Sequence, residues 1–295
     1  NFSIGWLAKI EGIFRKHNLD VELILMQGPS TYLPALLSNN IQVLYGGGTA
    51  VSRTIAAADA PIVVIGTETR YVPQRLMVAP SIKTVADLKG KKIGVSRAGL
   101  DEYATLYLLE KYNLVPNKDV ALFYTTGGTL ARAAQMKQGL FDAMTVSPPN
   151  EIELEKLGFR ELVNFFDLRM GYAGIPYTVT RDFRDKNPRV LTDFMTAIVE
   201  AIQVYRTNRE AAYRAIVRIT RQNDPNLLEK THKNNLAQYD AIQGQPFPWQ
   251  DGIESMITGF HARFTPAIVK NRDARPYLDP TFVQKAVERL AIGKK

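Results

Sequence analysis

Short apolar runs rich in β-branched residues alternate with helical segments up to residue 180, and this alternation most constrains the fold. The predicted strands are Val21–Met26, Gln42–Tyr45, Pro61–Gly66, Gln74–Ala79, Lys92–Ser96, Val120–Thr125, Phe141–Val146 and Tyr177–Thr180. The predicted helices are Trp6–Lys16, Thr31–Ser38, Thr49–Ala58, Asp101–Tyr112, Leu130–Gln138 and Asn150–Leu157. Strands that alternate with helices of about ten residues indicate βαβ units and mainly parallel sheets flanked by helices. We therefore expect an α/β fold.

The carboxyl-terminal third has a different pattern, because the apolar period is helical almost throughout from Pro188. Helix start signals are Asn187–Pro188, Asp224–Pro225 and Asp279–Pro280. One buried helix face is marked by Leu191, Phe194, Ile198, Ile202 and Tyr205. The sequence thus predicts two α/β halves, the second bounded by Pro80 and Pro176, followed by a helical tail.

Composition excludes several classes of function. The absence of cysteine removes disulfides, thiolate metal sites and cysteine nucleophiles. The net charge of +8 favours anionic partners, but the basic residues are spread along the chain and no zinc spacing or RNA-binding signature occurs, so we expect no nucleic-acid partner. The longest apolar runs fall short of the roughly 18 residues of a membrane span. The chain begins at Asn1 without a signal-peptide pattern, and we expect it to be a trimmed product.

Four strand-to-helix turns are the candidate binding positions, because ligands of open α/β sheets bind beyond the carboxyl ends of strands. The residues that we expect to contact a ligand there are Gly46, Gly47, Gly48, Thr49, Arg97, Gly99, Asp101, Thr126, Gly127, Gly128, Thr129, Ser147 and Pro148. Ordinary turns and helix caps are the alternative for each of them. No phosphate-loop or dinucleotide-binding fingerprint is present, so no nucleotide cofactor is expected.

Cationic and aromatic side chains near these turns could complete a site. Arg70 with Tyr71, and Arg97, could bind a carboxylate or sulfonate through charge-assisted hydrogen bonds. An apolar wall could be formed by Phe2, Trp6, Tyr172 and Tyr177, with core packing as the alternative.

Catalytic motifs are scarce in this sequence. No zinc-protease or nucleophile-elbow motif occurs, and the three histidines lie among charged or helical residues, so we expect neither catalytic residues nor a metal. Asp101 and Glu102 could be an acid–base pair, but two acids at a helix start are also what the helix dipole favours.

Several motifs in sequence order resemble the substrate-binding proteins of ABC importers of the nitrate/sulfonate/taurine type. They are Gly12–Phe14 with Asn18–Leu23, Pro34–Ser38, Gly46–Ala50, Asp87–Val95 ("DLKGKKIGV"), and Gly139–Ala143 with Pro148. Asn18 and Asn39–Asn40 stand where the family has glycines, and the family's first strand should precede Asn1.

This resemblance implies a two-lobe, class II periplasmic-binding fold. Residues 1–79 with 177–295 would form lobe one and residues 80–176 lobe two, with a small-molecule ligand in the cleft between them. It further implies an extracytoplasmic receptor, periplasmic or membrane-associated outside the cell, that acts as a monomer, needs no cofactor and delivers its ligand to an ABC permease. The ligand would be a sulfonate, nitrate or carboxylate, or a heteroaromatic compound facing Tyr71, Tyr103 and Tyr172.

An enzyme on the same fold is the main alternative. Thiamin-pyrimidine synthases resemble this family but carry a cysteine-rich motif, which is absent here. A menaquinone-pathway lyase needs little more than a pocket and one acid or base, for which Asp101 or Glu102 could serve. A ligand-sensing domain detached from a regulator would predict a DNA-binding segment, and none is seen in the sequence.

Overall fold

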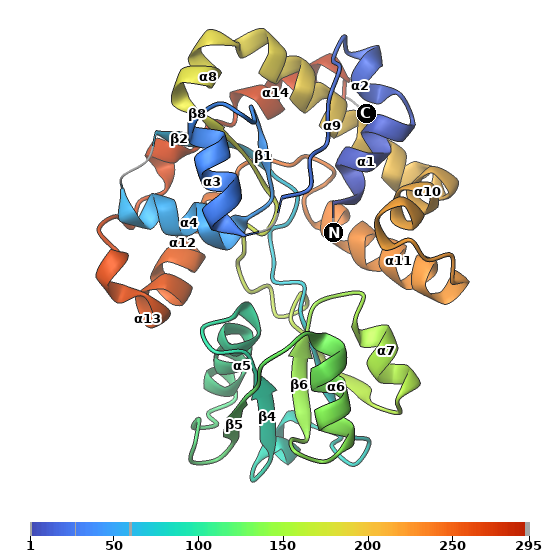
Figure 1. Cartoon of the computed structure of the whole chain (residues 1–295), viewed down its shortest axis with the longest axis vertical. Helices are drawn as coiled ribbons and strands as arrows, with labels where there is room; N and C mark the ends of the chain where they lie inside the picture. Colours follow the sequence, from blue (N-terminus) through green and yellow to red (C-terminus); the bar gives the residue numbers. More distant parts are fainter. Residues whose placement is uncertain (1, 27, 59–60, 293–295) are drawn as a thin grey trace. The chain divides into compact units, whose positions relative to one another are not determined.

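The structure is a computed structural model that describes residues 2–26, 28–58 and 61–292. The chain divides into two units, each with its own sheet (Figure 1). Unit 1 combines Asn1–Tyr71 with Gly171–Lys295, and unit 2 is the continuous segment Val72–Met170. The boundaries follow residues 71 and 170, where the sequence analysis placed them after residues 79 and 176.

Unit 1 contains a three-stranded sheet in the order β1 (Leu44–Tyr45), β8 (Pro176–Thr180), β2 (Ile62–Thr67). β8 runs antiparallel to both of its neighbours, so the prediction of a mainly parallel sheet is wrong for this unit. The reason is connectivity. β8 is the strand with which the chain re-enters unit 1 after unit 2, and it inserts between β1 and β2 in the opposite direction.

Among the described residues, four helices belong to the amino-terminal part of unit 1. They are α1 (Ser3–Ile10), α2 (Ile13–Lys16), α3 (Pro29–Leu37) and α4 (Gly48–Ala57). The single helix predicted over Trp6–Lys16 is broken at Gly12, whose φ of 70° is left-handed and ends the helical hydrogen-bonding pattern. Asn18 and Asn39 have φ values of 58° and 59°, so both adopt the left-handed conformation expected of asparagines in glycine positions.

The predicted strand Val21–Met26 is extended but is not a strand, and this prediction is wrong. A strand exists only when a neighbour bonds to its backbone. Within the described ranges, no backbone–backbone hydrogen bond involves this segment, and its Val21 carbonyl accepts instead from Nζ of Lys9 at 2.7 Å. Ile24 and Leu25 are consequently 57% and 82% exposed.

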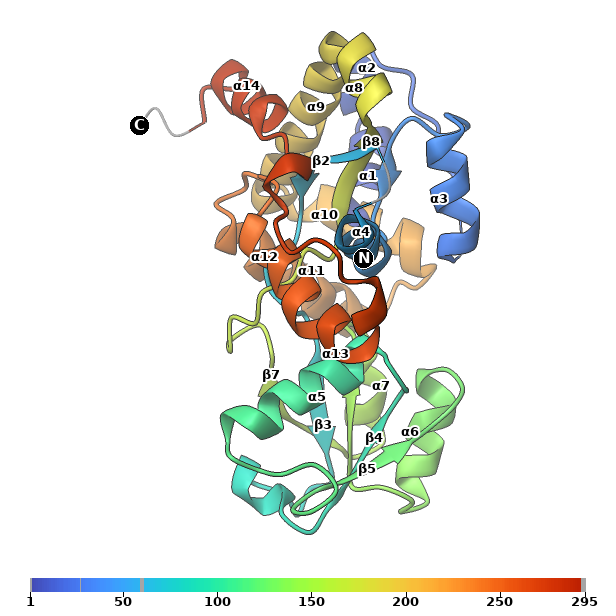
Figure 2. The same ribbon diagram turned by 90° about the vertical axis from the view of Figure 1, so that its left-hand side faces the viewer.

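The carboxyl-terminal helices follow β8 and complete unit 1 (Figure 2). They are α8 (Arg181–Lys186), α9 (Pro188–Thr207), α10 (Arg209–Thr220), α11 (Pro225–Ala241), α12 (Gln250–Ser255), a π-helical turn (Met256–His261), α13 (Ala262–Phe264), 3₁₀ turns at Pro266–Ile268 and Arg275–Tyr277, and α14 (Thr281–Arg289). The predicted start signals are confirmed at α9, α11 and α14. The five predicted face residues of α9 are all buried, and α1 and α14 pack on this helix.

Unit 2 contains a five-stranded mixed sheet. Its order is β5 (Ala121–Tyr124), β4 (Lys92–Val95), β6 (Ala143–Val146), β3 (Arg75–Val78), β7 (Arg160–Asn164). β4 runs parallel to β5 and β6, whereas β3, the strand by which the chain enters the unit, runs antiparallel to β6 and β7. The helices are α5 (Leu100–Lys111), α6 (Thr129–Lys137), α7 (Glu151–Lys156) and a 3₁₀ turn at Val85–Leu88. The sequence analysis did not predict β7.

Candidate ligand-binding site

The turn Gly46–Thr49 follows β1 and opens α4 in unit 1. Gly46 and Gly47 have φ values of 111° and 69°, which side chains rarely adopt. Gly48 is needed for a different reason, because a Cβ atom there would lie 2.0 Å from the carbonyl oxygen of Ala173. Each of the three glycines therefore serves the local backbone or its packing, which explains why one tight turn contains three of them.

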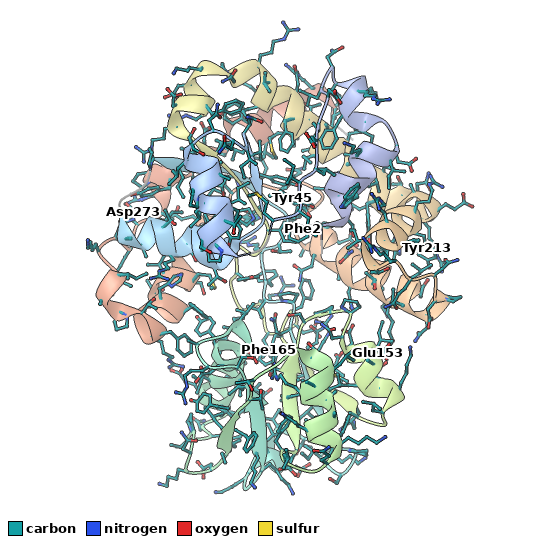
Figure 3. All side chains as sticks on the ribbon, viewed as in Figure 1. Phe2, Tyr45, Glu153, Phe165, Tyr213 and Asp273 are labelled. Carbon is teal, nitrogen blue, oxygen red and sulfur yellow. The ribbon has the colours of Figure 1, made fainter. Side chains whose placement is uncertain are left out.

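Aromatic rings surround this turn. A Cβ at Gly46 would lie 2.6 Å from the Phe2 ring, and one at Gly47 would lie 3.1 Å from the Tyr32 ring. Phe2 also meets Tyr45 edge to face at 5.2 Å between ring centroids (Figure 3). Phe2 remains 37% exposed, so its ring can contact a ligand. Tyr32 and Tyr45 were missed from the sequence, where nothing distinguishes them from core aromatics.

The buried side chains of Ser52 and His261 lie behind the turn. His261 Nε2 is 3.1 Å from the Thr49 carbonyl oxygen and 3.0 Å from Ser52 Oγ, and Ser52 Oγ also donates to the Thr49 carbonyl. Burial lowers the pKa of His261, which favours the neutral imidazole. Burial raises the pKa of Tyr172 to about 12, and the side chain of Thr49 opposes this rise. Neutral side chains thus hold the turn, and the Tyr172 hydroxyl interacts with the side chain of Thr49.

Tyr177 is fully buried and belongs to a polar cluster beneath the sheet. Its hydroxyl donates to the carboxylate of Glu68, which also accepts from the Tyr239 hydroxyl at 3.4 Å. Glu68 is itself fully buried, and burial raises its pKa to about 7. The structure therefore places Tyr177 in the core, where it anchors an acid that the sequence analysis did not single out.

Arg70 and Tyr71, the other pair predicted in unit 1, lie where the chain leaves the unit. The Arg70 guanidinium stacks 4.2 Å from the Trp249 ring centroid and pairs with Asp251 at 2.9 Å, so its charge is already matched. Tyr71 is 9% exposed and forms a β-bridge with Gly171.

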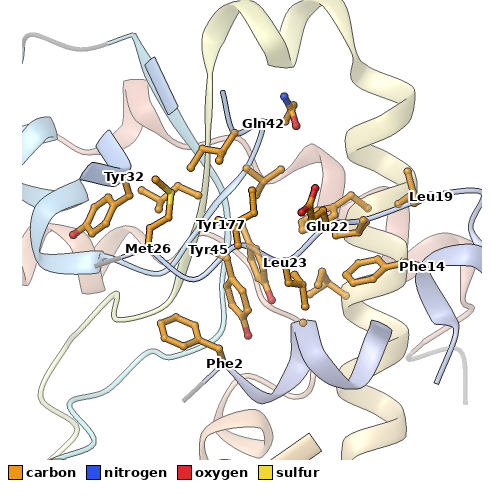
Figure 4. A pocket seen from close by; sticks show the side chains of 18 of the residues that line it. Phe2, Phe14, Leu19, Glu22, Leu23, Met26, Tyr32, Gln42, Tyr45 and Tyr177 are labelled. Atoms are coloured by element: carbon orange, nitrogen blue, oxygen red, sulfur yellow. The ribbon is translucent and has the colours of Figure 1, made fainter. Parts of the chain in front are cut away.

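Trp6 lines a groove of about 570 Å³. Gly47 of the glycine turn and the nearby rings of Phe2 and Tyr45 line the same groove (Figure 4). Its walls are the extended segment Leu19–Met26, α1, β1 and α9. The charged residues among those that line it are Asp20 and Glu22. The groove therefore presents apolar surface and acids, and it offers no cation to an anionic ligand.

The predicted residues of unit 2 gather at one sheet edge, because β4, β5 and β6 are parallel and their carboxyl ends coincide there. Arg97, in the turn after β4, is exposed and lies 4.0 Å from the ring centroid of Tyr124, the last residue of β5. Among the described residues, no carboxylate lies within ion-pair distance of Arg97. The Arg97 guanidinium thus lies over a ring, and no carboxylate among the described residues neutralises its charge.

Asp101 and Glu102, at the start of α5, support this turn from beneath. Asp101 accepts from the Ser96 N–H at 2.8 Å and pairs with buried Arg132 at 3.0 Å. Glu102 accepts from the Ala98 N–H at 2.6 Å and from the Tyr124 hydroxyl at 2.7 Å. The hydrogen bond with Glu102 also raises the pKa of Tyr124. Both acids are more than nine-tenths buried, so the structure uses them as caps.

The turn before α6 is more open. Gly127 has a φ of 94°, whereas a Cβ at Gly128 would have no atom within 4 Å. Thr126 is exposed and Thr129 is half-buried. In the third turn, Ser147 Oγ accepts from Gln74 Nε2 at 3.0 Å, and the Pro148–Pro149 peptide bond is cis. Gly128, Thr126 and Arg97 are therefore exposed residues at the same edge of this sheet.

Two further properties bear on function. In the part of the chain that the structure describes, no three metal-ligating side chains cluster as a metal site would require. None of the described helices is both long and apolar enough to cross a membrane.

Comparison with known proteins agrees with this architecture. A model of the family described as NMT1/THI5-like matches residues 1–212. "Putative binding protein YtlA" of Bacillus subtilis (strain 168) is 25% identical over 206 residues, which span 67% of this chain and 60% of that protein, or less than two thirds of its length.

Solved structures show the same fold at lower identity. The periplasmic aliphatic sulphonate binding protein SsuA from Escherichia coli has a TM-score of 0.72 at 20% identity, covering 96% of this chain and 88% of that one. The desulfurization enzyme DSZB has a TM-score of 0.68 at 18% identity, covering 98% and 96%.

Proposed function

The chain belongs to the NMT1/THI5-like family, and from this we propose that it is a solute-binding receptor that delivers a small organic ligand to an ABC import permease. The motifs that indicated this family lie between residues 6 and 210, within the matched range 1–212. The ligand binds between unit 1 and unit 2, which close over it by bending at their two connections. The receptor acts outside the cytoplasm as a monomer.

The exposed guanidinium of Arg97 is the observation that supports an anionic ligand, either aliphatic or aromatic. It has no carboxylate partner among the described residues and is stacked on Tyr124. A planar guanidinium binds a carboxylate or sulfonate through two parallel hydrogen bonds. Thr126 and Gly128 are exposed on the same sheet edge, and the Phe2 and Tyr32 rings in unit 1 suit a flat or apolar remainder of the ligand.

The descriptions of the relatives support a receptor. The Bacillus protein is described as a binding protein, and the Escherichia coli protein as a periplasmic sulphonate-binding protein. By analogy with the Escherichia coli protein we place this chain outside the cytoplasm. A permease is the partner that an import receptor requires.

An enzyme on the same fold is the alternative, and DSZB is described as one. The lyase hypothesis relied on Asp101 or Glu102 as the acid or base. Both carboxylates are buried and engaged with Ser96, Arg132, Ala98 and Tyr124, which leaves neither free for proton transfer. The structure therefore favours binding without turnover.

The test is a thermal-shift and calorimetric titration with nitrate, ethanesulfonate, benzenesulfonate and benzoate. A ligand that binds only the folded state raises the melting temperature by mass action. We expect at least one probe to do so and to be recovered unchanged by mass spectrometry. A chemically altered probe would support the enzyme, and four probes without effect would contradict an anionic ligand.

The Arg97→Ala variant then tests the role of this residue with the best probe. We expect its affinity to fall about tenfold or more, because a charge-assisted hydrogen bond is worth roughly 1.5–3 kcal/mol. Lys137→Ala is the matched control, since it removes the same charge from an exposed position in the last turn of α6. Equal affinities for the two variants would remove Arg97 from the site.

A further inference from the structure

The two connections between the units run as a hydrogen-bonded pair. We call residues 68–71 the outgoing connection and residues 171–175 the return connection. The Glu68 N–H donates to the Ile175 carbonyl at 3.0 Å, the Gly174 N–H to Thr69 Oγ1 at 3.0 Å, and the Tyr172 N–H to the Arg70 carbonyl at 2.9 Å. The pair ends in the β-bridge between Tyr71 and Gly171, directly at the unit boundary.

Glycines let two other elements of unit 1 touch the backbone of the return connection. A Cβ at Gly48, in the turn before α4, would lie 2.0 Å from the Ala173 carbonyl oxygen. A Cβ at Gly252, in α12, would lie 3.0 Å from the carbonyl carbon of Tyr172. Neither glycine has a left-handed φ, so the need for glycine at both positions is steric. We call Gly48, Ala173 and Gly252 the clamp.

The clamp is anchored in the core of unit 1. Ala173 is 1% exposed and packs in one cluster with Val51 and Ile55 of α4 and with Ile253 of α12. His261 fastens the start of α4 through the Thr49 carbonyl at 3.1 Å. The return connection is therefore part of the packed body of unit 1 as far as Ala173.

We propose that the clamp fixes the return connection to unit 1 and so confines bending between the units to the residues at the boundary, near Tyr71–Val72 and Met170–Gly171. This inference rests on the proposed function in one respect only, namely that the two units move relative to each other. Since Gly48 belongs to the clamp and to the glycine turn, a ligand seated on that turn presses on the element that limits the motion. Packed backbone of this kind transmits small displacements because it does not deform continuously.

The experiment uses the absence of cysteine in the chain. Spin labels are attached at Lys118→Cys in unit 2 and Lys233→Cys in unit 1, both exposed positions, and pulsed electron paramagnetic resonance measures the distance between them without any ligand. Gly48→Ala and Gly252→Ala should each roughly double the width of the distance distribution, because the displaced connection adds a second flexible segment. Gly128→Ala is the control, because an added Cβ there would meet no atom within 4 Å. The width of its distance distribution should equal that of the parent.

Unchanged widths in both clamp variants, with a cooperative thermal transition to show that they fold, would overturn the proposal. If the variants do not fold, amide hydrogen exchange of the parent protein tests whether the return connection is fixed to unit 1. The clamp predicts that the amides of Tyr172 and Gly174 are protected like those of β8, and exchange as fast as in exposed loops would overturn it. Because neither measurement uses a ligand, a failure of the receptor proposal would not change the outcome expected here.

Discussion

Glu68 shows how one residue can make the stability of this protein depend on pH. Its carboxylate is fully buried, and its hydrogen-bonding partners are the hydroxyls of Tyr177 and Tyr239. Hydroxyl donors stabilise the charged form less than water does, so burial dominates and raises the pKa to about 7. The folded chain therefore holds a proton at a pH at which the unfolded chain has released it.

We predict that this group destabilises the folded state as the pH rises. Between pH 4.5, the ordinary pKa of the group, and about 7, the folded state binds more protons than the unfolded state, so the free energy of unfolding falls with rising pH. The expected fall across this window is about 3 kcal/mol. Urea unfolding of the parent and of Glu68→Gln at about pH 5 and about pH 8 measures it, because the amide does not titrate. An identical pH dependence in both proteins would show that Glu68 does not hold its proton.

At the scale of single elements, a glycine precedes both α5 and α6, but the surroundings of the two glycines differ. Both follow a glycine with extended backbone, Gly99 with φ of −94° and Gly128 with φ of −74°. A Cβ at Gly99 would lie 2.4 Å from Asp101 Oδ1, the carboxylate that caps the turn, whereas a Cβ at Gly128 meets no atom within 4 Å. One glycine is required by packing, and the other leaves open backbone.

This difference predicts opposite outcomes for the same substitution. Gly99→Ala should lower the free energy of unfolding by about 1–3 kcal/mol, because it displaces the Asp101 carboxylate from Ser96 and Arg132. Gly128→Ala should change it by less than about 0.5 kcal/mol, as a substitution in open space does. Chemical unfolding of both variants measures the difference. Equal losses would mean that the Asp101 cap does not determine the start of α5.

At the scale of the whole molecule, the two units differ in how the chain builds them. Unit 2 is one continuous segment with a five-stranded sheet and its own core around Met77, Phe141 and Met144, whereas unit 1 needs both ends of the chain. A continuous segment with a core of its own can fold alone. We predict that residues 72–170, expressed separately, unfold in one cooperative transition.

The measurement is near-ultraviolet circular dichroism with thermal unfolding of that fragment. A fragment without fixed tertiary signal would show that unit 2 requires unit 1. The matched fragment of the same design is residues 1–71, which lacks β8 and should not fold, because β8 is the central strand of the unit 1 sheet.

The sequence by itself determined the features that depend on neighbours along the chain. Proline start signals located α9, α11 and α14, and the apolar period located the buried face of α9. Of the asparagines that stand where the family has glycines, Asn18 and Asn39 are left-handed. The family motifs were recognised for the same reason, since each is a short local pattern, and the family model confirms them.

Only the tertiary structure decided what depends on contacts far apart in sequence. Val21–Met26 has the composition of a strand but no backbone partner, and β8 runs antiparallel because it returns from another unit. The candidate site follows the same rule. Asp101 is held by Arg132, Arg70 is matched by Asp251, and Arg97 keeps its charge available, although all three were equivalent candidates in the sequence. Local patterns set the conformation of each segment, whereas burial and charge pairing arise only when distant segments meet.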